Sequence, residues 1–285
     1  MIQTITVIGA GTMGHGIAQL CAQKGFAVFL QDISEDALKK ALERVNENLQ
    51  KGLDKGKLTA DEKKATLERL RFTTSLEEAS KTDLVIEAVF EDIQVKKSIF
   101  QKLDQQTPPE TILASNTSSL SLTEIASFTN RPGQVIGLHF FNPPYIMKLL
   151  EIVLAHQTTN GTRQQALDLS QKLGKEAILV KDSPGFATSR LGIVLGMEAI
   201  RMLQEGVASA EDIDRAMELG YGHPMGPLKL TDLVGLDVRL AITEYLYKEL
   251  GTPQFLPPPL LKKMVRAGYL GKKTGKGFYH YGENV

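Results

Sequence analysis

Cysteine is nearly absent from this chain of 285 residues, which contains Cys21 alone. A single cysteine excludes an internal disulfide and any zinc cluster built from cysteines, and we expect it to be a small buried residue. Net charge is absent as well, because 33 lysines and arginines balance 33 acidic residues. No broad field therefore favours nucleic acid or a membrane as a partner, and any site for a charged ligand must be local.

Long uninterrupted apolar runs are missing too. The uncharged stretch 1–23 lacks a basic start and contains four glycines, which is not the pattern of a signal peptide. The uncharged stretch 132–147 contains prolines and glycines that would interrupt a membrane-spanning helix. We therefore expect a cytoplasmic protein, or a matrix protein whose transit peptide has been removed.

Short β-branched runs alternate with helical patterns through the first 180 residues, which is typical of a mostly parallel sheet covered by helices. The candidate strands are residues 5–8, 28–30, 84–86, 112–114, 135–138, 152–154 and 178–180. Between residues 34 and 70 the pattern changes to two charged helices around a lysine-rich turn at 51–57. This segment predicts a projecting helical hairpin.

Beyond residue 185 the β-branched runs stop and helical periodicity takes over, with an N-terminal capping pattern at Ser209–Asp212. The predicted fold class is therefore α/β: a Rossmann-type, doubly wound, mostly parallel sheet with a helical-hairpin insertion, followed by an all-helical domain. We place the first domain at residues 1–183 and the second at 184–285.

A glycine-rich loop follows the first predicted strand and precedes a helix. The sequence GAGTMG at residues 9–14 has the G-x-G-x-x-G spacing of a dinucleotide-binding turn. The first glycine permits the turn, the second lets the backbone approach a pyrophosphate, and the third lets the helix pack on the strand. The residues expected to hold the cofactor phosphates are Gly9, Gly11, Thr12, Met13 and Gly14. The alternative is a glycine turn in a sheet that binds no nucleotide.

Asp32 ends the second predicted strand, near the distance from the last glycine at which a ribose-binding acid is expected. Its carboxylate would accept hydrogen bonds from the ribose hydroxyls and repel a 2′-phosphate. Since residues 33–35 contain no arginine, the sequence favours NAD over NADP. The expected first domain is thus an NAD-binding domain.

An acid–base group is the second requirement for hydride transfer from an alcohol, and histidine suits this role near neutral pH. His139 follows a predicted strand of the nucleotide domain, where ligands of open sheets gather. Glu151 begins the next strand and could orient the imidazole, as in hydrolase triads. A structural histidine is the alternative. His15, His156, His223 and His280 show no metal-ligand spacing, so we expect structural or surface roles for them and no metal site.

Five further segments, taken with the glycine loop and Asp32, resemble the L-3-hydroxyacyl-CoA dehydrogenase family over nearly the whole chain. They are SNTSS (115–119), GLHFFNPP (137–144), MKLLE (147–151), DSPGF (182–186) and GKKTGKGFY (271–279). The resemblance implies reversible NAD-dependent oxidation of an L-3-hydroxyacyl-CoA, with 3-hydroxybutyryl-CoA as the expected short-chain substrate. It implies a role in fatty-acid β-oxidation or butanoate metabolism and leaves the direction open.

The resemblance also implies roles for individual residues. His139 would be the catalytic base and Glu151 its orienting carboxylate. Ser118 would hydrogen-bond the substrate C3 oxygen, and Asn116 and Asn142 would flank the nicotinamide and the reacting carbons. Neutral amide and hydroxyl donors can polarise a carbonyl without titrating. Two further positions, Glu91 and Lys96, match family positions near the nicotinamide ribose.

Ser189 departs from the family pattern, since it occupies the place of an asparagine expected to bind the substrate carbonyl region. A serine hydroxyl reaches less far than an amide. The hairpin provides candidates for contact with CoA, with Lys55 nearest the family's CoA-contacting position and Asn48 on the helix before it. The alternative for the hairpin lysines, including Lys51 and Lys57, is a solvated turn.

The helical domain is expected to complete the substrate site, close over a thioester entering between the domains, and form a homodimer. The apolar stretch 191–197 would be a dimer or interdomain face, or else internal core. Two other functions stay open. One is a CoA-independent β-hydroxy acid dehydrogenase that uses a lysine base, and the other is a non-catalytic NAD-binding structural or sensor protein.

Overall fold

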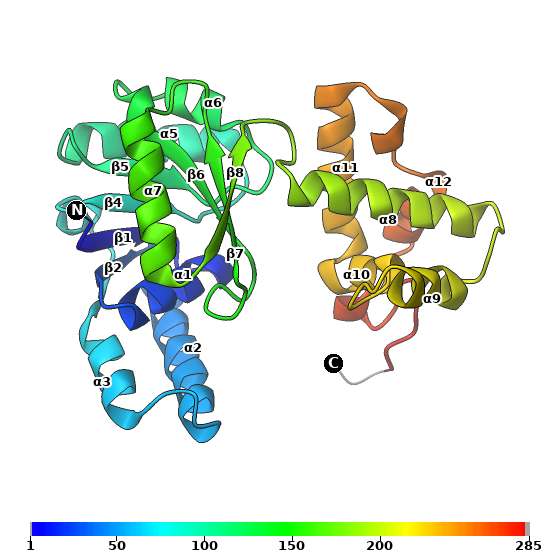
Figure 1. Ribbon diagram of the computed structural model, residues 1–285, viewed down its shortest axis with the longest axis horizontal. Coiled ribbons are helices and arrows are strands. Elements are labelled where there is room, and N and C mark those ends of the chain that lie inside the picture. The colour runs from blue at the N-terminus through cyan, green and yellow to red at the C-terminus, as the bar shows by residue number, and fades with distance from the viewer. Residues whose placement is uncertain (1, 283–285) are drawn as a thin grey trace. The chain divides into compact units, whose positions relative to one another are not determined.

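The structure is a computed structural model that describes residues 2–282. The chain divides into two compact units, one ending at Ser183 and one beginning at Pro184. Each unit has its own apolar core. We describe the two units separately (Figure 1).

The first unit is built on an eight-stranded sheet with the order β3-β2-β1-β4-β5-β6-β7-β8. All neighbouring strands pair in parallel except β6 and β7, which are antiparallel. The strands are β1 (Thr4–Ile8), β2 (Ala27–Gln31), β3 (Leu70–Thr73), β4 (Leu84–Glu87), β5 (Ile112–Ser115), β6 (Val135–Phe140), β7 (Leu149–Leu154) and β8 (Glu176–Lys181). The mostly parallel Rossmann-type sheet predicted from the sequence is confirmed.

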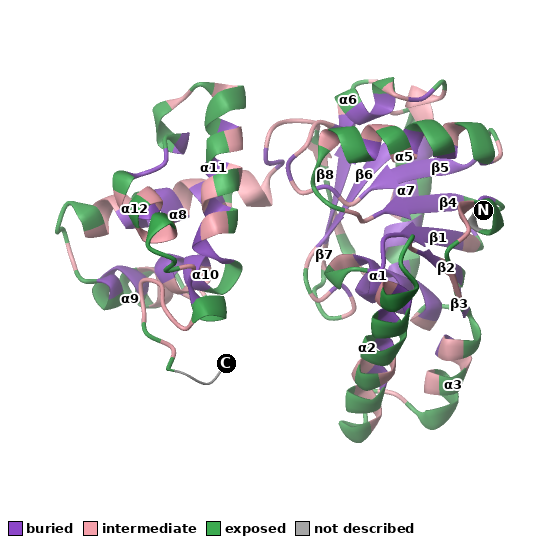
Figure 2. Cartoon of the chain, turned by 180° about the vertical axis from the view of Figure 1, so that it is seen from behind, coloured by how far each residue is buried: buried purple, intermediate pink, exposed green. Residues whose placement is uncertain are grey.

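Helices cover both faces of this sheet. Residues of α1 (Thr12–Gln23) and α7 (Asn160–Leu173) share one apolar cluster with the central strands. The opposite face is covered by α5 (Ile93–Gln106) and α6 (Leu122–Ser127), as the views from the two sides show (Figures 1 and 2). The buried strands lie between these two helical layers, which places the carboxyl ends of β1, β4 and β5 along one edge.

The predicted helical hairpin is present between β2 and β3. It consists of α2 (Glu35–Asp54) and α3 (Ala60–Glu68), which project from the sheet (Figure 1). Ser34 caps α2, and Thr59 and Glu62 form a reciprocal capping box on α3, so both helix starts satisfy their first amide groups. The short α4 (Leu76–Ala79) follows β3.

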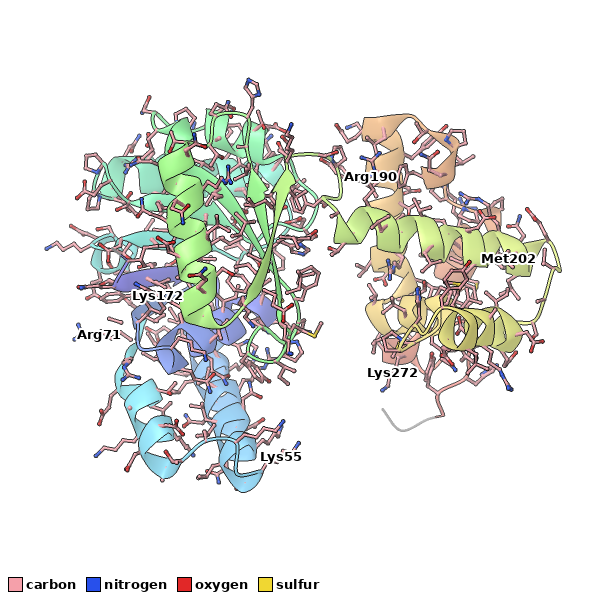
Figure 3. The ribbon with its side chains drawn as sticks, in the orientation of Figure 1. Lys55, Arg71, Lys172, Arg190, Met202 and Lys272 are labelled. Atoms are coloured by element: carbon pink, nitrogen blue, oxygen red, sulfur yellow. The ribbon has the colours of Figure 1, made fainter. Side chains whose placement is uncertain are left out.

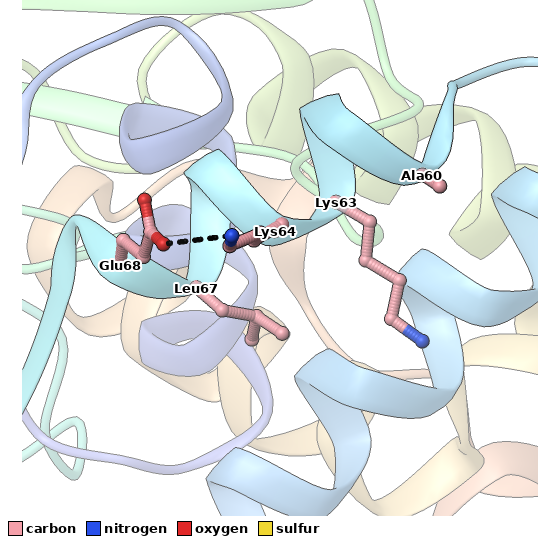
Figure 4. A pocket seen from close by; sticks show the side chains of 5 residues that line it. All are labelled: Ala60, Lys63, Lys64, Leu67 and Glu68. Carbon is pink, nitrogen blue, oxygen red and sulfur yellow. Dashed lines mark ion pairs between the residues drawn. The ribbon is translucent and has the colours of Figure 1, made fainter.

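A hollow of about 410 Å³ lies beside α3 (Figure 4). It is lined by Ala60, Lys63, Lys64, Leu67 and Glu68. The Lys64 ammonium lies 4.0 Å from the Glu68 carboxylate, and both side chains are largely exposed. Solvent-exposed pairs of this kind contribute little to stability, so this hollow is a solvated helix face.

The second unit is helical, as predicted. Its helices are α8 (Thr188–Gln204), α9 (Ala210–Gly220), α10 (Pro227–Val234), α11 (Leu236–Leu250) and α12 (Pro259–Arg266). Short 3₁₀ turns occupy Pro132–Gln134 in the first unit and Pro253–Phe255 and Lys272–Thr274 in the second. Ser209 caps α9 through Asp212, as the capping pattern predicted. The apolar stretch 191–197 is mixed, because Ile193 and Met197 are buried whereas Leu191 is exposed.

Two buried aspartates fix the C-terminal segment of the second unit. Asp214 accepts hydrogen bonds from the backbone of Leu228 (2.8 Å) and from the Tyr279 hydroxyl (2.8 Å). Asp232 accepts from the Tyr279 backbone (2.9 Å) and the Tyr281 hydroxyl (2.9 Å). A Cβ atom on Gly277 would lie 2.0 Å from Asp232 Oδ1. The glycine-rich segment 271–279 therefore wraps closely around a buried carboxylate.

One strand was missed by the sequence analysis. β3 is four residues long, lies at the edge of the sheet and contains Arg71, so it has no β-branched run. Cys21 is fully buried as expected, and burial raises the pKa of its thiol to about 12. Within residues 2–282, no helix is both long and apolar enough to cross a membrane.

Candidate functional site

The glycine loop connects β1 to α1 in a conformation that only glycine fits. Gly9 has a φ of +97°, and a Cβ there would lie 2.8 Å from the Ala88 carbonyl oxygen. A Cβ on Gly14 would lie 1.7 Å from the Gly9 oxygen, so the helix could not pack as closely on the loop. At Gly11, by contrast, a Cβ would meet nothing within 4 Å, so this side of the loop is open.

The N-terminus of α1 is available to an anion. Gly11 is the N-cap residue, and no side chain of the described residues caps this helix. Thr12 and Met13 therefore begin a helix whose first amide groups need acceptors. Their dipoles favour negative charge at this end, which suits a pyrophosphate.

Asp32 is tied to the same loop. Its Oδ2 accepts a hydrogen bond from the backbone of Ala10 (2.7 Å), and its Oδ1 accepts from the backbone of Ser34 (2.9 Å). A carboxylate oxygen has two lone pairs, so each oxygen keeps one for a ligand hydroxyl. The structure thus brings the predicted ribose acid next to the predicted phosphate loop.

His139 and Glu151 face each other across the antiparallel pair β6–β7, where they are direct register partners. The Nδ1 atom of His139 lies 2.6 Å from Glu151 Oε2. Both side chains are buried, and the His139 ring lies 4.5 Å from the Phe141 ring between centroids. The strands, rather than a loop, hold this pair, which matches the predicted histidine and carboxylate.

A charged network lies at the ends of β4 and β5. The ammonium group of Lys96 on α5 is within 2.7 Å of the Glu87 carboxylate and 3.4 Å of Glu91. Lys96 and Glu87 are almost fully buried. Burial acts to raise the pKa of Glu91, but the Lys96 charge and hydrogen bonds from Thr117 and Ser118 outweigh it, so that pKa is lowered.

The loop after β5 is organised by the same network. Glu91 Oε1 accepts hydrogen bonds from the Thr117 hydroxyl (2.6 Å) and the Ser118 backbone (2.9 Å). Asn116, one residue earlier, accepts from the backbone of Phe140 through its side-chain oxygen (2.9 Å), next to His139 in sequence. Contacts of the first unit therefore link Glu91, Lys96, Asn116 and Ser118, all predicted from the resemblance.

A hollow of about 330 Å³ lies where α1 and α2 meet the segment after β6. It is lined by Thr12, His15, Arg44, Asn48, Asn142, Pro143, Pro144 and Tyr145. Two predicted substrate residues, Asn48 and Asn142, thus line the same hollow as the start of α1. The Asn48 amide also donates to the buried Gln19 side chain (3.2 Å).

Several residues at these places were not predicted from the sequence. His15 and Arg44 line the hollow, and His15 Nδ1 lies 2.7 Å from the Gly11 carbonyl oxygen. Burial lowers the pKa of His15. Glu87 was missed as well, although a charged residue directly after the apolar run of β4 was a readable signal. A carboxylate at the carboxyl end of a central strand lies where ligands gather.

Two further predicted residues lie at helix ends. Lys55 ends α2 at the far end of the hairpin and is exposed (Figure 3). Ser189 lies in the first turn of α8, in the second unit. The described residues contain no group of three or more histidine, cysteine or acidic side chains that could hold a metal ion.

Family models match both units. The NAD-binding domain of 3-hydroxyacyl-CoA dehydrogenase matches residues 4–183, and the C-terminal domain of the same enzymes matches residues 185–281. A probable 3-hydroxybutyryl-CoA dehydrogenase of Bacillus subtilis is 48% identical over 100% of this chain and 99% of its own length. The 3-hydroxybutyryl-CoA dehydrogenase of Clostridioides difficile is 47% identical over 97% of this chain and 99% of its own.

Solved structures agree with the sequence comparisons. The crystal structure of (S)-3-hydroxybutyryl-CoA dehydrogenase from Ralstonia eutropha has a TM-score of 0.97 and 44% identity, covering 99% of this chain and 100% of that one. Together, the domain matches, the full-length relatives and the glycine loop with its acid lead to one conclusion. This chain belongs to the 3-hydroxyacyl-CoA dehydrogenase family, the NAD-dependent oxidoreductases of 3-hydroxyacyl-CoA thioesters.

Proposed function

We propose that this protein oxidises short-chain L-3-hydroxyacyl-CoA, with 3-hydroxybutyryl-CoA as its substrate, reversibly and with His139 as the acid–base residue. The observation that carries this proposal is the buried His139–Glu151 pair, 2.6 Å apart across two strands. The names of the relatives support the short acyl chain, since several are 3-hydroxybutyryl-CoA dehydrogenases.

His139 would act through its Nε2 atom. With Glu151 as a carboxylate, which can only accept, the Nδ1–H group of His139 donates to it and Nε2 keeps its lone pair. Nε2 then takes the C3 hydroxyl proton during oxidation and returns it during reduction. Bound NAD supplies the acceptor for the C3 hydride. Glu151 stabilises the imidazolium that forms and prevents the ring from turning.

The cofactor residues in this proposal are those gathered at the carboxyl edge of the sheet. Gly9, Gly11 and the first amides of α1 would bind the pyrophosphate, and Asp32 the adenosine ribose. At the nicotinamide end, Asn116, Glu91 and Lys96 would contact the ring and its ribose. The open space beside Gly11 and the remaining lone pairs of Asp32 support this assignment.

The substrate residues in this proposal are those that the family resemblance implies. The Ser118 hydroxyl would hydrogen-bond the C3 oxygen, and Asn142 would lie beside the reacting carbons. Asn48 and Lys55 would contact CoA, which the hollow lined by Asn48 and Asn142 supports. Ser189 would contribute a shorter donor than the family asparagine to the thioester region.

The proposal also includes a homodimer formed through the helical domain. It places the protein in the cytoplasm, with no nucleic-acid or membrane partner. Exposed large apolar side chains on or directly beside the described helices of the second unit support an association surface. They include Leu191, Leu219, Tyr221, Leu233 and Val238. Sedimentation of the purified protein measures the oligomeric state, and a monomer at micromolar concentration contradicts this part.

The activity is tested with acetoacetyl-CoA and NADH in a spectrophotometric assay, alongside acetoacetate without CoA. We expect NADH oxidation with the thioester and far slower oxidation with the free acid. NADH binding without turnover would overturn the enzyme proposal in favour of a sensor or structural role. Equal rates with both substrates would favour a CoA-independent dehydrogenase. Against that alternative, Lys96 on α5, whose ammonium group lies near the ends of β4 and β5, is paired with Glu87 and is not poised as a base.

A further inference from the structure

Glu87 ends β4 and its carboxylate is fully buried. It accepts hydrogen bonds from the Lys96 ammonium (2.7 and 2.9 Å), the Ser115 hydroxyl (2.6 Å) and the Val89 backbone (2.8 Å). A buried carboxylate is costly unless it is paired and hydrogen-bonded, and this one is saturated with donors. Its position is therefore set from three elements at once: α5, the end of β5 and the turn after β4.

Lys96 connects Glu87 to a second carboxylate, that of Glu91. Its ammonium group is held by both Glu87 oxygens and also lies 3.4 Å from Glu91 Oε2. The Lys96 side chain is about 1% exposed, so water does not compete for it. One buried cation thus has two acidic partners, and the net charge of the group is negative.

Glu91 in turn holds the turn that carries Ser118. Its Oε1 accepts from the Thr117 hydroxyl at 2.6 Å, from the Ser118 backbone at 2.9 Å and from the Ser119 backbone at 3.2 Å. The Ser118 hydroxyl itself lies 3.3 Å from the same oxygen. The chain of contacts from Glu87 through Lys96 to Glu91 therefore reaches the Ser118 hydroxyl. This is the hydroxyl proposed to hydrogen-bond the substrate C3 oxygen.

We propose that Glu87 is a positioning residue: it fixes Lys96, Lys96 fixes Glu91, and Glu91 orients the Ser118 turn for the reacting oxygen. The inference rests on the proposed contact between Ser118 and the substrate. Glu87 touches neither substrate nor cofactor in this scheme. Its charge is what matters, because the Lys96 ammonium is shared between two carboxylates and its position depends on both.

The test is a double-mutant cycle of Glu87→Gln with Ser118→Ala. Glutamine keeps the shape but loses the charge. Its NH₂ group must face the Lys96 ammonium together with either the Val89 N–H or the Ser115 hydroxyl, because Lys96 donates to both Glu87 oxygens. We expect kcat for acetoacetyl-CoA reduction to fall by about tenfold to hundredfold, as small misplacements of catalytic groups do, with KM for the thioester changing less. In the Ser118→Ala background, Glu87→Gln should lower kcat less than about twofold further.

Glu110→Gln is the matched control, because it makes the same chemical change at an exposed position before β5. It should leave kcat and KM unchanged. Losses that multiply fully in the double mutant would overturn the inference, because Glu87 would then affect turnover by a route that does not pass through Ser118. No effect of Ser118→Ala on turnover would instead contradict the proposed function at Ser118, and the two failures are thereby distinguished.

The paired variant Glu87→Met with Lys96→Met covers the case in which Glu87→Gln unfolds. Replacing both partners of a buried ion pair with apolar residues of similar volume is often neutral for stability. We expect this variant to fold and its kcat to fall at least as far as that of Glu87→Gln. Adding Ser118→Ala to it should lower kcat by less than about twofold further. A folded double variant with wild-type kcat would overturn the inference.

Discussion

Buried carboxylates have different partners in the two units. In the first unit, Glu151 pairs with a histidine and Glu87 with a lysine, so buried acids meet titratable side chains at the ends of strands. In the second unit, Asp214 and Asp232 meet backbone amides and tyrosine hydroxyls. The acids in both places are fully shielded from solvent. Burial alone therefore does not distinguish a carboxylate that takes part in proton transfer from one that only stabilises the fold.

The partners separate the two roles. Backbone amides do not titrate near neutral pH, so these partners give Asp214 and Asp232 a role in holding the chain in place. Tyrosine hydroxyls behave the same way here, because burial and the neighbouring aspartates raise the pKa values of Tyr279 and Tyr281 well above the ordinary range. Asp232 also has a raised pKa, chiefly through burial. An imidazole beside a carboxylate, by contrast, is poised for proton transfer.

Replacing His139 should have the largest effect of the predicted changes. His139→Gln removes the acid–base group, and general acid–base catalysis typically contributes about 10²- to 10⁴-fold. We expect kcat to fall by about that factor while NADH binding, followed by fluorescence titration, is retained. His156→Gln, at an exposed histidine, is the control and should leave kcat unchanged. Retained turnover would favour a different base.

Asp214→Ala should reduce stability and leave turnover per folded molecule intact. The change leaves the Leu228 and Lys229 amides without their acceptor, whereas the Tyr279 hydroxyl keeps the Ala210 carbonyl at 3.0 Å. At about 1–3 kcal/mol for each of these two buried unsatisfied donors, the free energy of unfolding should fall by about 2 kcal/mol or more. Chemical denaturation measures this loss.

Exposed Glu211 on the same helix provides the control for Asp214. Glu211→Ala removes a favourable first-turn charge only, so we expect a loss below about 1 kcal/mol. If Asp214→Ala abolishes turnover while the unfolding midpoint is unchanged, the structural role assigned to the second unit's aspartates is wrong.

Glu151→Gln should cost less catalysis than His139→Gln. The glutamine retains the volume and an acceptor oxygen, but it is neutral, so the ionic strengthening of the hydrogen bond to the imidazolium is lost; hydrogen bonds to charged groups contribute about 1.5–3 kcal/mol. We expect kcat to fall by about 10- to 100-fold, with little further loss when His139→Gln is added. Glu176→Gln, at the exposed start of β8, should change nothing. Equal losses in Glu176→Gln would show that the effect is not specific to the pair.

The smallest effect is expected from Glu91→Gln on the pH dependence of stability. The folded state lowers the pKa of Glu91 below its ordinary value of 4.5, so it favours the ionised form. That stabilisation is present above the ordinary value and is lost as the pH falls through the lowered pKa. Glu91→Gln should therefore flatten the acid limb of the unfolding curve below pH 4.5 and leave its slope at pH 7 unchanged. A variant with the same acid limb as the parent protein would contradict this.

Much of the first unit could be predicted because its features are local in sequence. The glycine spacing and Asp32 follow from one strand–turn–helix unit, and the alternation of runs predicts the sheet. β3 could not be found this way, since a short edge strand with a charged residue has no apolar run. The reversal between β6 and β7 had a readable sign: only eight residues, 141–148, connect them, too few for a parallel crossover.

The site was predictable in part for the same reason. His139 and Glu151 stand out because they flank the predicted strands 135–138 and 152–154. In the structure both lie inside β6 and β7, and their 2.6 Å contact depends on register. Glu87, His15 and Arg44 were missed because their importance comes from other elements. These are α5 and the end of β5 for Glu87, and the α1–α2 junction for the other two. No spacing rule along the chain reveals such neighbours.

The antiparallel pairing of β6 with β7 has a consequence for how the substrate range could be redesigned. Because His139 and Glu151 are joined by ladder register, the connecting segment 141–148 does not itself set their separation. That segment supplies Asn142 and Tyr145 to the hollow beside α1. Changes in its length or composition that spare Asn142 would therefore reshape this hollow while the His139–Glu151 pair stays aligned. A one-residue insertion inside either strand would instead turn one partner to the opposite face.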